Sequence, residues 1–380
     1  MNPLDGVRVL ELARILAGPW AGQVLADLGA DVIKVESPAG DDTRRWGPPF
    51  VDNQDGSQDA AYFHATNRGK RSVIIDFSTP EGAEQARLLV AEADVLIENF
   101  KVGGLAKYGL DYASLKELNP RLVYCSITGF GQDGPYASRP GYDFIIQGMS
   151  GIMDLTGDPD GEPQKIGVAF ADIFSGLYSV IAIQAALMQR EKTGLGQHID
   201  MALLDCMIGV LANQGLNFLS SGESPKRMGN RHPNIAPYEA LPVSDGWFIL
   251  AVGNDRQFQR FCELVGLDDM PDDERFASNS ARVENRQELT AQITQATRQW
   301  QRDELLAALE DVGVPAGPIN TVEQAFEDPQ VRFREMQLLL QRASGGTPIP
   351  GIRTPIRFSE AELNLESPSP QAGDDEPKWR

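Results

Sequence analysis

The stretch Val7-Arg-Val-Leu-Glu-Leu12, followed by the turn Ala17-Gly-Pro-Trp-Ala-Gly22 and by Asp31-Val-Ile-Lys-Val35, decides the fold class. The two apolar runs have the length of buried strands, and residues 19–28 between them have the pattern of a helix. Three more strand-like runs follow at intervals: Ser72-Val-Ile-Ile-Asp76, Val95-Leu-Ile97 and Leu122-Val-Tyr-Cys-Ser-Ile127. We therefore expect an α/β fold with a Rossmann-like, mainly parallel sheet, helices on both of its faces, and ligands at the carboxyl ends of its strands.

A second, smaller α+β domain is expected because 380 residues exceed what one hydrophobic core usually organises. The composition becomes linker-like over residues 220–234, and Gly246-Trp-Phe-Ile-Leu-Ala-Val252 then begins a new strand pattern. The predicted division is a large domain at 1–222, a small domain at 223–330, and a segment at 331–380 that returns to the large domain. We expect roughly the last dozen residues to be extended or disordered.

The composition argues against several classes of protein. A net charge of −20 disfavours nucleic acid as a partner, because phosphate binding needs a dominant basic face. No apolar run approaches the ~20 residues that span a bilayer, so no membrane partner is expected. The N-terminus has no signal-peptide pattern, and the three cysteines form no Cys-x-x-Cys pair. We therefore expect a cytoplasmic protein with reduced thiols and no metal site.

Asp172 is the most informative single residue, because it is a lone carboxylate among apolar neighbours in Gly167-Val-Ala-Phe-Ala-Asp-Ile-Phe174. The apolar pattern after Ile173 predicts a helix, so Asp172 falls at its N-cap or in its first turn. The helix dipole favours the charged carboxylate, whereas removal of water raises its pKa and makes the ion more reactive. The pattern fits either a helix cap or a carboxylate nucleophile.

Two further features bear on whether the ligand is an anion. The segment from Arg44-Arg45 to Arg68-Gly-Lys70-Arg71 contains five cations, which fit either an anion site or a solvated loop balanced by acids such as Asp42. The turn at Gly18 and Gly22 follows a strand, but its glycine spacing does not match the dinucleotide-binding fingerprint.

The chain as a whole resembles the class III CoA-transferase family, to which formyl-CoA transferase and carnitine CoA-transferase belong. The order of the matching motifs carries the resemblance: Ala17-Gly-Pro19, Leu25-Ala-Asp-Leu-Gly-Ala-Asp-Val-Ile-Lys-Val-Glu36, Asn67-Arg-Gly-Lys-Arg-Ser72, Glu98-Asn-Phe100, Thr128-Gly-Phe-Gly131, Gly141-Tyr-Asp143 and Gly313-Val-Pro-Ala-Gly-Pro-Ile-Asn320. The segments around Arg231 and Gly253 look most like the branch that transfers CoA from succinyl-CoA to dicarboxylic acids such as glutarate and hydroxymethylglutarate.

The resemblance implies that Asp172 is a nucleophile that forms an anhydride and then a thioester during CoA transfer. It implies CoA esters as substrates, no permanently bound cofactor, a carboxylic acid as acceptor, and an interlocked homodimer. By this resemblance, the residues expected at the CoA ester are Arg44, Arg71, Ser72, Val73, Asn99, Phe100, Lys101, Lys107 and Tyr142. Those expected at the acyl group or the acceptor are Arg14, Leu16, Arg231 and His232.

Two departures from relatives narrow the activity. Methylacyl-CoA racemases on this fold have His where Tyr142 stands, and a tyrosine with a pKa of roughly 10 is a poor base at neutral pH, which favours transfer over racemisation. Leu16 stands where formyl-CoA transferase has Gln, so a formyl donor is not expected. A racemase-like enzyme and a non-catalytic homologue that binds CoA esters remain as alternatives.

Overall fold

The computed structural model describes residues 1–343 and 345–380, which divide into two compact units. The first unit contains Met1–Ile152, Lys165–Glu223 and Pro329–Arg380, and the second contains Met153–Gln164 and Ser224–Asp328. The sequence gives no sign that residues 153–164 leave the first unit. They join the second because Arg227 donates hydrogen bonds to the carbonyl oxygens of Asp154 and Gly161.

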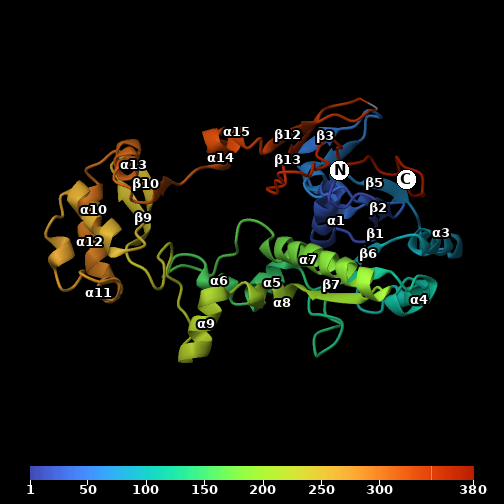
Figure 1. Ribbon diagram of the computed structural model, residues 1–380, viewed down its shortest axis with the longest axis horizontal. Helices are drawn as coiled ribbons and strands as arrows, with labels where there is room; N and C mark the ends of the chain where they lie inside the picture. The colour runs from blue at the N-terminus through green and yellow to red at the C-terminus, as the bar shows by residue number, and fades with distance from the viewer. Residues whose placement is uncertain (344) are drawn as a thin grey trace. The chain divides into compact units, whose positions relative to one another are not determined.

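The described part of the first unit contains a sheet of six strands in the order β5-β2-β1-β6-β7-β8 (Figure 1). Every neighbouring pair in this sheet is parallel, which confirms the predicted α/β class. The strands are β1 (Arg8–Glu11), β2 (Asp31–Glu36), β5 (Arg71–Ile74), β6 (Val95–Glu98), β7 (Val123–Thr128) and β8 (His198–Ala202). The sequence pattern did not predict β8, a short edge strand with polar residues in a Gly-rich neighbourhood.

Helices cover both faces of this sheet. Val9, Val32 and Val95 point into a core with α1 (Ala17–Asp27), α7 (Phe170–Thr193) and α8 (Leu203–Gly209). Their neighbours Leu10, Ile33 and Leu96 point into a second core with α3 (Pro80–Ala91) and α4 (Tyr112–Leu118). This alternation follows from the two-residue period of a strand, and it explains why the strands read as continuous apolar runs.

The strand order reverses between β1 and β6, because β2 and β5 lie on one side of β1 and β6, β7 and β8 on the other. Ligands of open parallel sheets bind outside the carboxyl ends of the strands at such a point. The loops that follow Glu11 and Glu98 therefore mark the expected ligand site.

The remaining elements of the first unit are short. They are β3 (Phe50–Asp52), β4 (Gln58–Ala60), α2 (Ala61–His64), α5 (Asp143–Met149), α9 (Ala212–Ser221), α15 (Pro329–Phe333), β12 (Gln337–Leu340) and β13 (Ile349–Ile352), with 3₁₀ turns η1 (Asp42–Arg45) and η2 (Ala106–Tyr108). The apolar pattern over residues 202–219 predicts a single helix, which is wrong, because the backbone breaks before Ala212, whose φ is 47°, and two helices form. Helix α6 (Ile152–Leu155) lies at the junction of the two units.

The second unit is built on an antiparallel sheet in the order β11-β10-β9. Phe248 and Leu250 of β10 pack with Phe258 and Phe261 of α10 in its core. The described elements are β9 (Tyr238–Val243), β10 (Gly246–Ala251), α10 (Asp255–Val265), η3 (Met270–Asp272), α11 (Asn279–Glu284), α12 (Arg286–Thr297), α13 (Arg302–Asp311), β11 (Ala316–Pro318) and α14 (Val322–Glu327). This is the expected α+β composition.

The C-terminal tail contains no helix or strand but is ordered against the edge strand β5, so of the two expected states, extended or disordered, the disordered one is wrong. The Asp375 amide donates to the Ser72 carbonyl at 3.0 Å, and the Asp375 carboxylate accepts from the Ser72 amide at 3.0 Å. The Trp379 indole donates to the Leu89 carbonyl at 3.0 Å. The tail thereby pairs backbone groups that an edge strand would leave exposed.

Helix α7 is long and apolar enough to cross a membrane by length and composition alone, which corrects the sequence-based statement that no run approaches that length. It packs against α1 within the first unit, and 44% of its apolar window is buried. A core helix of a soluble protein meets the same criteria, so the absence of a membrane partner stays a prediction.

Candidate active site

Asp172 lies in the first turn of α7, as predicted. Helix α7 begins at Phe170, and its N-cap residue, Ala169, provides no side-chain hydrogen bond. The Asp172 side chain is half-buried, and it forms no salt bridge among the described residues. Burial, and next to it the negative charge of Asp143, raise the pKa of Asp172 to about 7. Asp172 is therefore a carboxylate whose ion is poorly stabilised by its surroundings, as a nucleophile requires.

Asp143 is a site residue that the sequence analysis missed. It is the first residue of α5, and its Oδ1 accepts hydrogen bonds from the amides of Ala171 at 2.8 Å and Asp172 at 3.4 Å. Its Oδ2 accepts from Gln147 Nε2 at 2.7 Å. The carboxylate that caps α7 thus comes from a residue 29 positions earlier, and Asp172 is not the cap.

Tyr62 of α2 is a second residue that sequence reasoning missed. Burial raises the pKa of its phenol, and the charges of Asp172, Asp143 and Asp41 raise it further. The ring makes an edge contact with Trp46, with the ring centroids 5.3 Å apart. The phenol therefore lies in the same electrostatic neighbourhood as Asp172, where a hydroxyl donor can meet a developing oxyanion.

The structure brings together several predicted residues at the reversal of strand order. The Arg14 amide donates to Asn99 Oδ1 at 2.9 Å, and Asn99 Nδ2 donates to the Arg14 carbonyl at 2.7 Å. The Arg14 guanidinium lies 5.7 Å from the Phe100 ring centroid and contacts Asp42 at 3.2 Å. Leu16, next in this turn, is buried.

Three of the residues expected at the CoA ester are exposed. Lys101 and Lys107 follow β6 and form no salt bridge among the described residues, so they are open cations beside Phe100 and Tyr108. Tyr142 is 64% exposed at the N-cap of α5, directly before Asp143. These side chains are free to meet a ligand.

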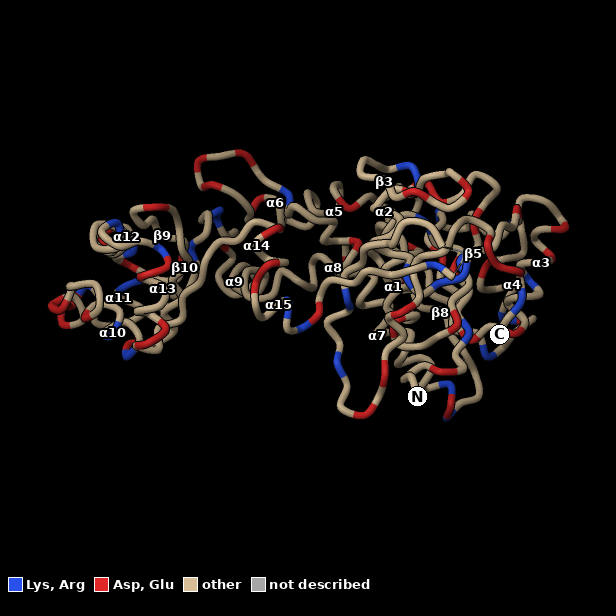
Figure 2. Tube along the Cα trace, turned by 90° about the horizontal axis from the view of Figure 1, so that it is seen from above, with Lys and Arg blue, Asp and Glu red and all other residues tan. Residues whose placement is uncertain are grey.

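Arg44, in contrast, is occupied by internal carboxylates. It is buried, donates to Glu36 at 2.6 Å and contacts Asp59 at 2.9 Å. The expected basic cluster is therefore not an open anion site, because each of its cations has its own acid: Arg45 with Asp42, Arg68 with Asp27, Lys70 with Glu11, and Arg71 with Asp31. Figure 2 shows Lys and Arg interspersed with Asp and Glu around β3 and β5.

The other residues of β5 are also engaged within the protein. The Arg71 guanidinium donates two hydrogen bonds to the Asp31 carboxylate and a third to the Lys378 carbonyl of the tail, at 2.8 Å. The Ser72 hydroxyl donates to Glu36 at 2.6 Å, and Val73 is a core residue. This geometry gives no support to contact between a CoA ester and the side chains of Arg71, Ser72 and Val73.

Arg231 and His232 belong to the second unit. Arg231 is half-exposed and pairs with Glu239 at 3.3 Å, while the His232 ring lies 5.2 Å from the Tyr238 ring centroid. His232 Nδ1 accepts the Asn234 amide at 3.1 Å. Arg231 retains exposed donors that can reach an acid, whereas His232 mainly shapes its own loop.

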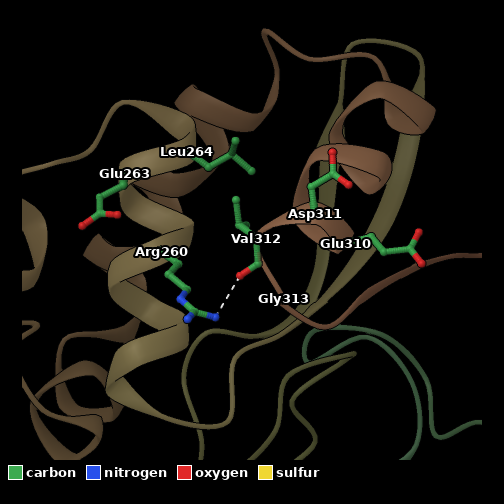
Figure 3. A pocket seen from close by; sticks show the side chains of 7 residues that line it. All are labelled: Arg260, Glu263, Leu264, Glu310, Asp311, Val312 and Gly313. Carbon is green, nitrogen blue, oxygen red and sulfur yellow. Dashed lines mark hydrogen bonds between the residues drawn. The ribbon is translucent and has the colours of Figure 1, made fainter.

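A hollow of about 610 Å³ in the second unit is a poor candidate for a substrate site (Figure 3). Arg260, which faces it, donates to the Val312 carbonyl at 3.0 Å. Figure 3 shows the carboxylates of Glu263, Glu310 and Asp311 pointing away from its centre. In the described part of the chain, we find no group of three or more His, Cys, Asp or Glu residues suited to a metal ion.

Comparisons with known proteins identify the family of the chain. A sequence model of CoA-transferase family III matches residues 4–376. The chain is 61% identical over 374 residues to the succinate–glutarate CoA-transferase of Agrobacterium fabrum, covering 98% of this chain and 93% of that protein. It is 38% identical over 375 residues to the succinyl-CoA:glutarate CoA-transferase of Homo sapiens, covering 98% and 84%.

A crystal structure gives the same result. A CAIB/BAIF family protein from Brucella suis matches with a TM-score of 0.88 and 67% identity, covering 98% of this chain and 97% of that one. The chain therefore belongs to CoA-transferase family III and is a CoA-transferase, an enzyme whose substrates are CoA thioesters.

Proposed function

We propose that this enzyme transfers CoA from succinyl-CoA to glutarate or a closely related dicarboxylic acid through covalent intermediates on Asp172. The observation that carries the mechanism is the Asp172 carboxylate, half-buried in the first turn of α7 with a pKa raised to about 7. The names of the relatives at 61% and 38% identity support the choice of donor and acceptor.

The proposed reaction has four exchanges, each of which forms one bond to carbon and breaks another. An Asp172 oxygen attacks the thioester carbon of succinyl-CoA, and the C–S bond breaks to give a mixed anhydride and CoA thiolate. The thiolate attacks the Asp172 carbonyl carbon, which releases succinate and leaves an aspartyl thioester. The acceptor carboxylate displaces CoA to form a second anhydride, and the thiolate then attacks the acceptor carbon and frees Asp172.

Residues at the site have matching roles in this proposal. Lys101 and Lys107 offer exposed ammonium groups to the phosphates of CoA. The hydroxyls of Tyr62 and Tyr142 are donors for the developing oxyanions. Arg14, paired with the exchangeable carboxylate of Asp42, is the cation for the distal carboxylate of the acceptor. The expected contact of Arg231 with substrate stays a prediction.

The first test is mass spectrometry of CoA esters after the enzyme is mixed with succinyl-CoA and a set of acids: glutarate, hydroxymethylglutarate, malate, itaconate, mesaconate, oxalate and carnitine. We expect new CoA esters with dicarboxylates. Asp172→Ala should abolish the reaction and Asp172→Asn should nearly abolish it. Full turnover by Asp172→Ala would refute the aspartyl mechanism, and deuterium entering the α-carbon without transfer would indicate a racemase.

The covalent step has its own measurement. Wild-type enzyme that is incubated with succinyl-CoA without an acceptor and rapidly denatured should carry CoA on the peptide that contains Asp172. The Asp172→Asn variant, which keeps the size of the side chain, is the matched control and should carry none. An adduct on another residue would contradict the assignment of the nucleophile.

We also propose that the enzyme is an interlocked homodimer in the cytoplasm. The first unit leaves several large apolar side chains exposed, including Phe144 at 58%, Ile181 at 62%, Met188 at 72% and Leu219 at 75%. Soluble monomers rarely leave such extended apolar surface open, so a second copy of the chain is the proposed cover. Light scattering should give twice the chain mass of 41.5 kDa, and cell fractionation tests the location.

A further inference from the structure

The turn that joins β1 to α1, residues 12–16, lies where ligands of such sheets bind. It follows the carboxyl end of β1, at the point where the strand order reverses. The reciprocal hydrogen bonds between the Arg14 backbone and Asn99 join it to the loop after β6. This turn therefore borders the candidate ligand site on its central side.

Ile15 holds the turn in an unusual backbone conformation. Its φ is 73°, in the left-handed region, and the other described non-glycine residues with positive φ are Ala212 and Glu335. A β-branched residue is disfavoured there, and such conformations persist when surrounding contacts fix them. The contacts around Ile15 should therefore explain why the chain accepts this cost.

A buried ion pair supplies these contacts. The Asp41 Oδ2 accepts the Ile15 amide at 3.4 Å and the Lys34 ammonium at 2.9 Å, while Oδ1 accepts from the amide and the hydroxyl of Thr43. The Lys34 ammonium also donates to the Ala13 carbonyl at 2.9 Å. The side chains of Lys34 and Asp41 are fully buried, so water does not compete for these bonds.

A second buried lysine holds the far end of the same stretch. The Lys70 ammonium donates to the Pro19 carbonyl at 2.8 Å and to Asn67 Oδ1 at 2.8 Å. Lys70 and Lys34 share the buried carboxylate of Glu11, at 2.8 Å and 3.1 Å. The carbonyls of Ala13 in the turn and of Pro19 in the first turn of α1 are thus fixed by two lysines around one glutamate.

Two observations place the turn and its clamp, the buried ion pair of Lys34 and Asp41, close to Asp172. Helix α1 packs tightly on α7, because a Cβ built on Gly176 would lie 2.8 Å from the Ala17 carbonyl oxygen, and Gly176 is one helical turn after Asp172. Besides burial, the negative charges of both Asp172 and Asp41 raise the pKa of the Tyr62 phenol. The turn, its clamp and the nucleophile therefore belong to one neighbourhood.

We propose that Asp41, held by Lys34, is a positioning residue: it keeps Ile15 in the left-handed conformation and thereby keeps the turn at Arg14, Ile15 and Leu16 in the shape that binds the CoA ester. Asp41 touches no reacting atom in this proposal. It acts through the Ile15 backbone, and its loss should weaken binding of the CoA moiety more than it slows the chemical steps. The inference rests on the proposed CoA-transfer function of this site.

The first experiment is a calorimetric titration of Ile15 variants with coenzyme A. Ile15→Pro fixes φ at roughly −65° and lacks the amide that donates to Asp41, so the turn loses its left-handed residue and the Kd for CoA should rise about tenfold or more. The KM for succinyl-CoA should rise in parallel, with kcat little changed. Ile15→Gly, which takes a positive φ without strain, and Ile15→Val, which keeps the β-branched side chain, should leave all three values unchanged.

Glu335→Pro is the matched control, because Glu335 also has a positive φ of 52° but is exposed and follows α15 outside the site. It should change neither Kd nor KM. If the conformation of Ile15 served folding alone, Ile15→Pro would change the thermal melting temperature and leave the Kd for CoA unchanged, which would overturn the proposal.

Asp41→Asn tests the clamp itself, and we expect the Kd for CoA to rise about tenfold or more, because a buried charged partner of Lys34 is lost. If this variant fails to fold, the Kd of Ile15→Pro for CoA decides the question. A wild-type enzyme that binds CoA but converts no acid would refute the proposed function while leaving the Kd test of the turn intact. A wild-type enzyme that binds no CoA would refute both.

Discussion

Replacing Asp143 by Asn should lower the pH at which the enzyme becomes active. The change removes a negative charge beside Asp172 and keeps an oxygen to accept the Ala171 amide, so the cap on α7 survives. Burial is the larger cause of the raised pKa of Asp172, so this pKa should fall from about 7 but stay above the ordinary 3.8. The nucleophile then loses its proton at lower pH.

The size of the change follows from the charge that is removed. Two unit charges about 8 Å apart interact by about 2 kcal/mol at an effective dielectric constant of about 20, which corresponds to about 1.5 pKa units. Solvent near the half-buried Asp172 weakens this interaction, so we expect a fall of roughly one unit in the pKa of Asp172.

The assay is kcat/KM for CoA transfer between pH 5 and 9. Only the carboxylate form of Asp172 attacks, so the wild-type rate should rise with pH around a midpoint near 7 and then level off. In Asp143→Asn the midpoint should move to about pH 6, and the plateau should fall because a weaker base is a weaker nucleophile. A midpoint that stays near 7 or rises would refute the reasoning.

Gln147→Leu separates charge from hydrogen bonding in this experiment. Gln147 Nε2 donates to Asp143 Oδ2 at 2.7 Å, and an asparagine at position 143 would disturb that bond as well. The Gln147→Leu variant loses the same bond and leaves the charge of Asp143 in place. Its midpoint should therefore stay near 7, whatever its stability.

Three further predictions concern stability. The folded protein binds the Asp172 proton more tightly than the unfolded chain does, so this contribution to stability is present below pH 3.8 and is lost as the pH rises through about 7. Asp172→Asn should therefore raise the free energy of unfolding by about 2–4 kcal/mol at pH 8 and by little at pH 4, as measured by urea denaturation. Gly22→Ala should lower it by about 3 kcal/mol or more, because the added Cβ would lie 1.8 Å from Glu11 Oε2, whereas the methyl of Gly209→Ala meets nothing within 4 Å and should cost nothing. Deleting residues 371–380 exposes the β5 edge and should lower the melting temperature, with aggregation at high concentration as a second readout.

The sequence allowed the parallel sheet to be predicted because its strands are buried on both faces and read as unbroken apolar runs. Strands β8 and β9 could not be predicted, for reasons that lie in their own sequences. His198–Ala202 is a half-polar edge strand, and Tyr238–Val243 contains Pro242, which counts against a strand in any pattern. The tail could not be predicted either, since its order depends on partners in β5 that lie about 300 residues earlier in the chain.

Some residues of the candidate site can likewise be predicted from the sequence, and others cannot. Asp172 stands out in the sequence because a lone carboxylate in an apolar helix start is unusual. Asp143 does not, because its role arises from the packing of α5 against α7. Arg44 and Arg71 look like free cations in a list of residues, and the chain alone does not reveal that Glu36, Asp59 and Asp31 neutralise them.

The glycines of the first turn show how a familiar pattern can serve another purpose. Gly18 and Gly22 are four residues apart, so they lie on the same face of α1. A Cβ on Gly18 would lie 2.3 Å from the Ala13 side chain, and one on Gly22 would strike the Glu11 carboxylate. The absent side chains let α1 approach the turn and the buried charges of β1. In a dinucleotide-binding fold a glycine of this turn lets the backbone approach a pyrophosphate, whereas here Gly22 makes room for the glutamate that the two buried lysines share and Gly18 makes room for Ala13. In this strand–turn–helix unit, buried side chains therefore fix the backbone of the turn at the ligand site. Specificity for the ligand must come from the residues that this backbone presents.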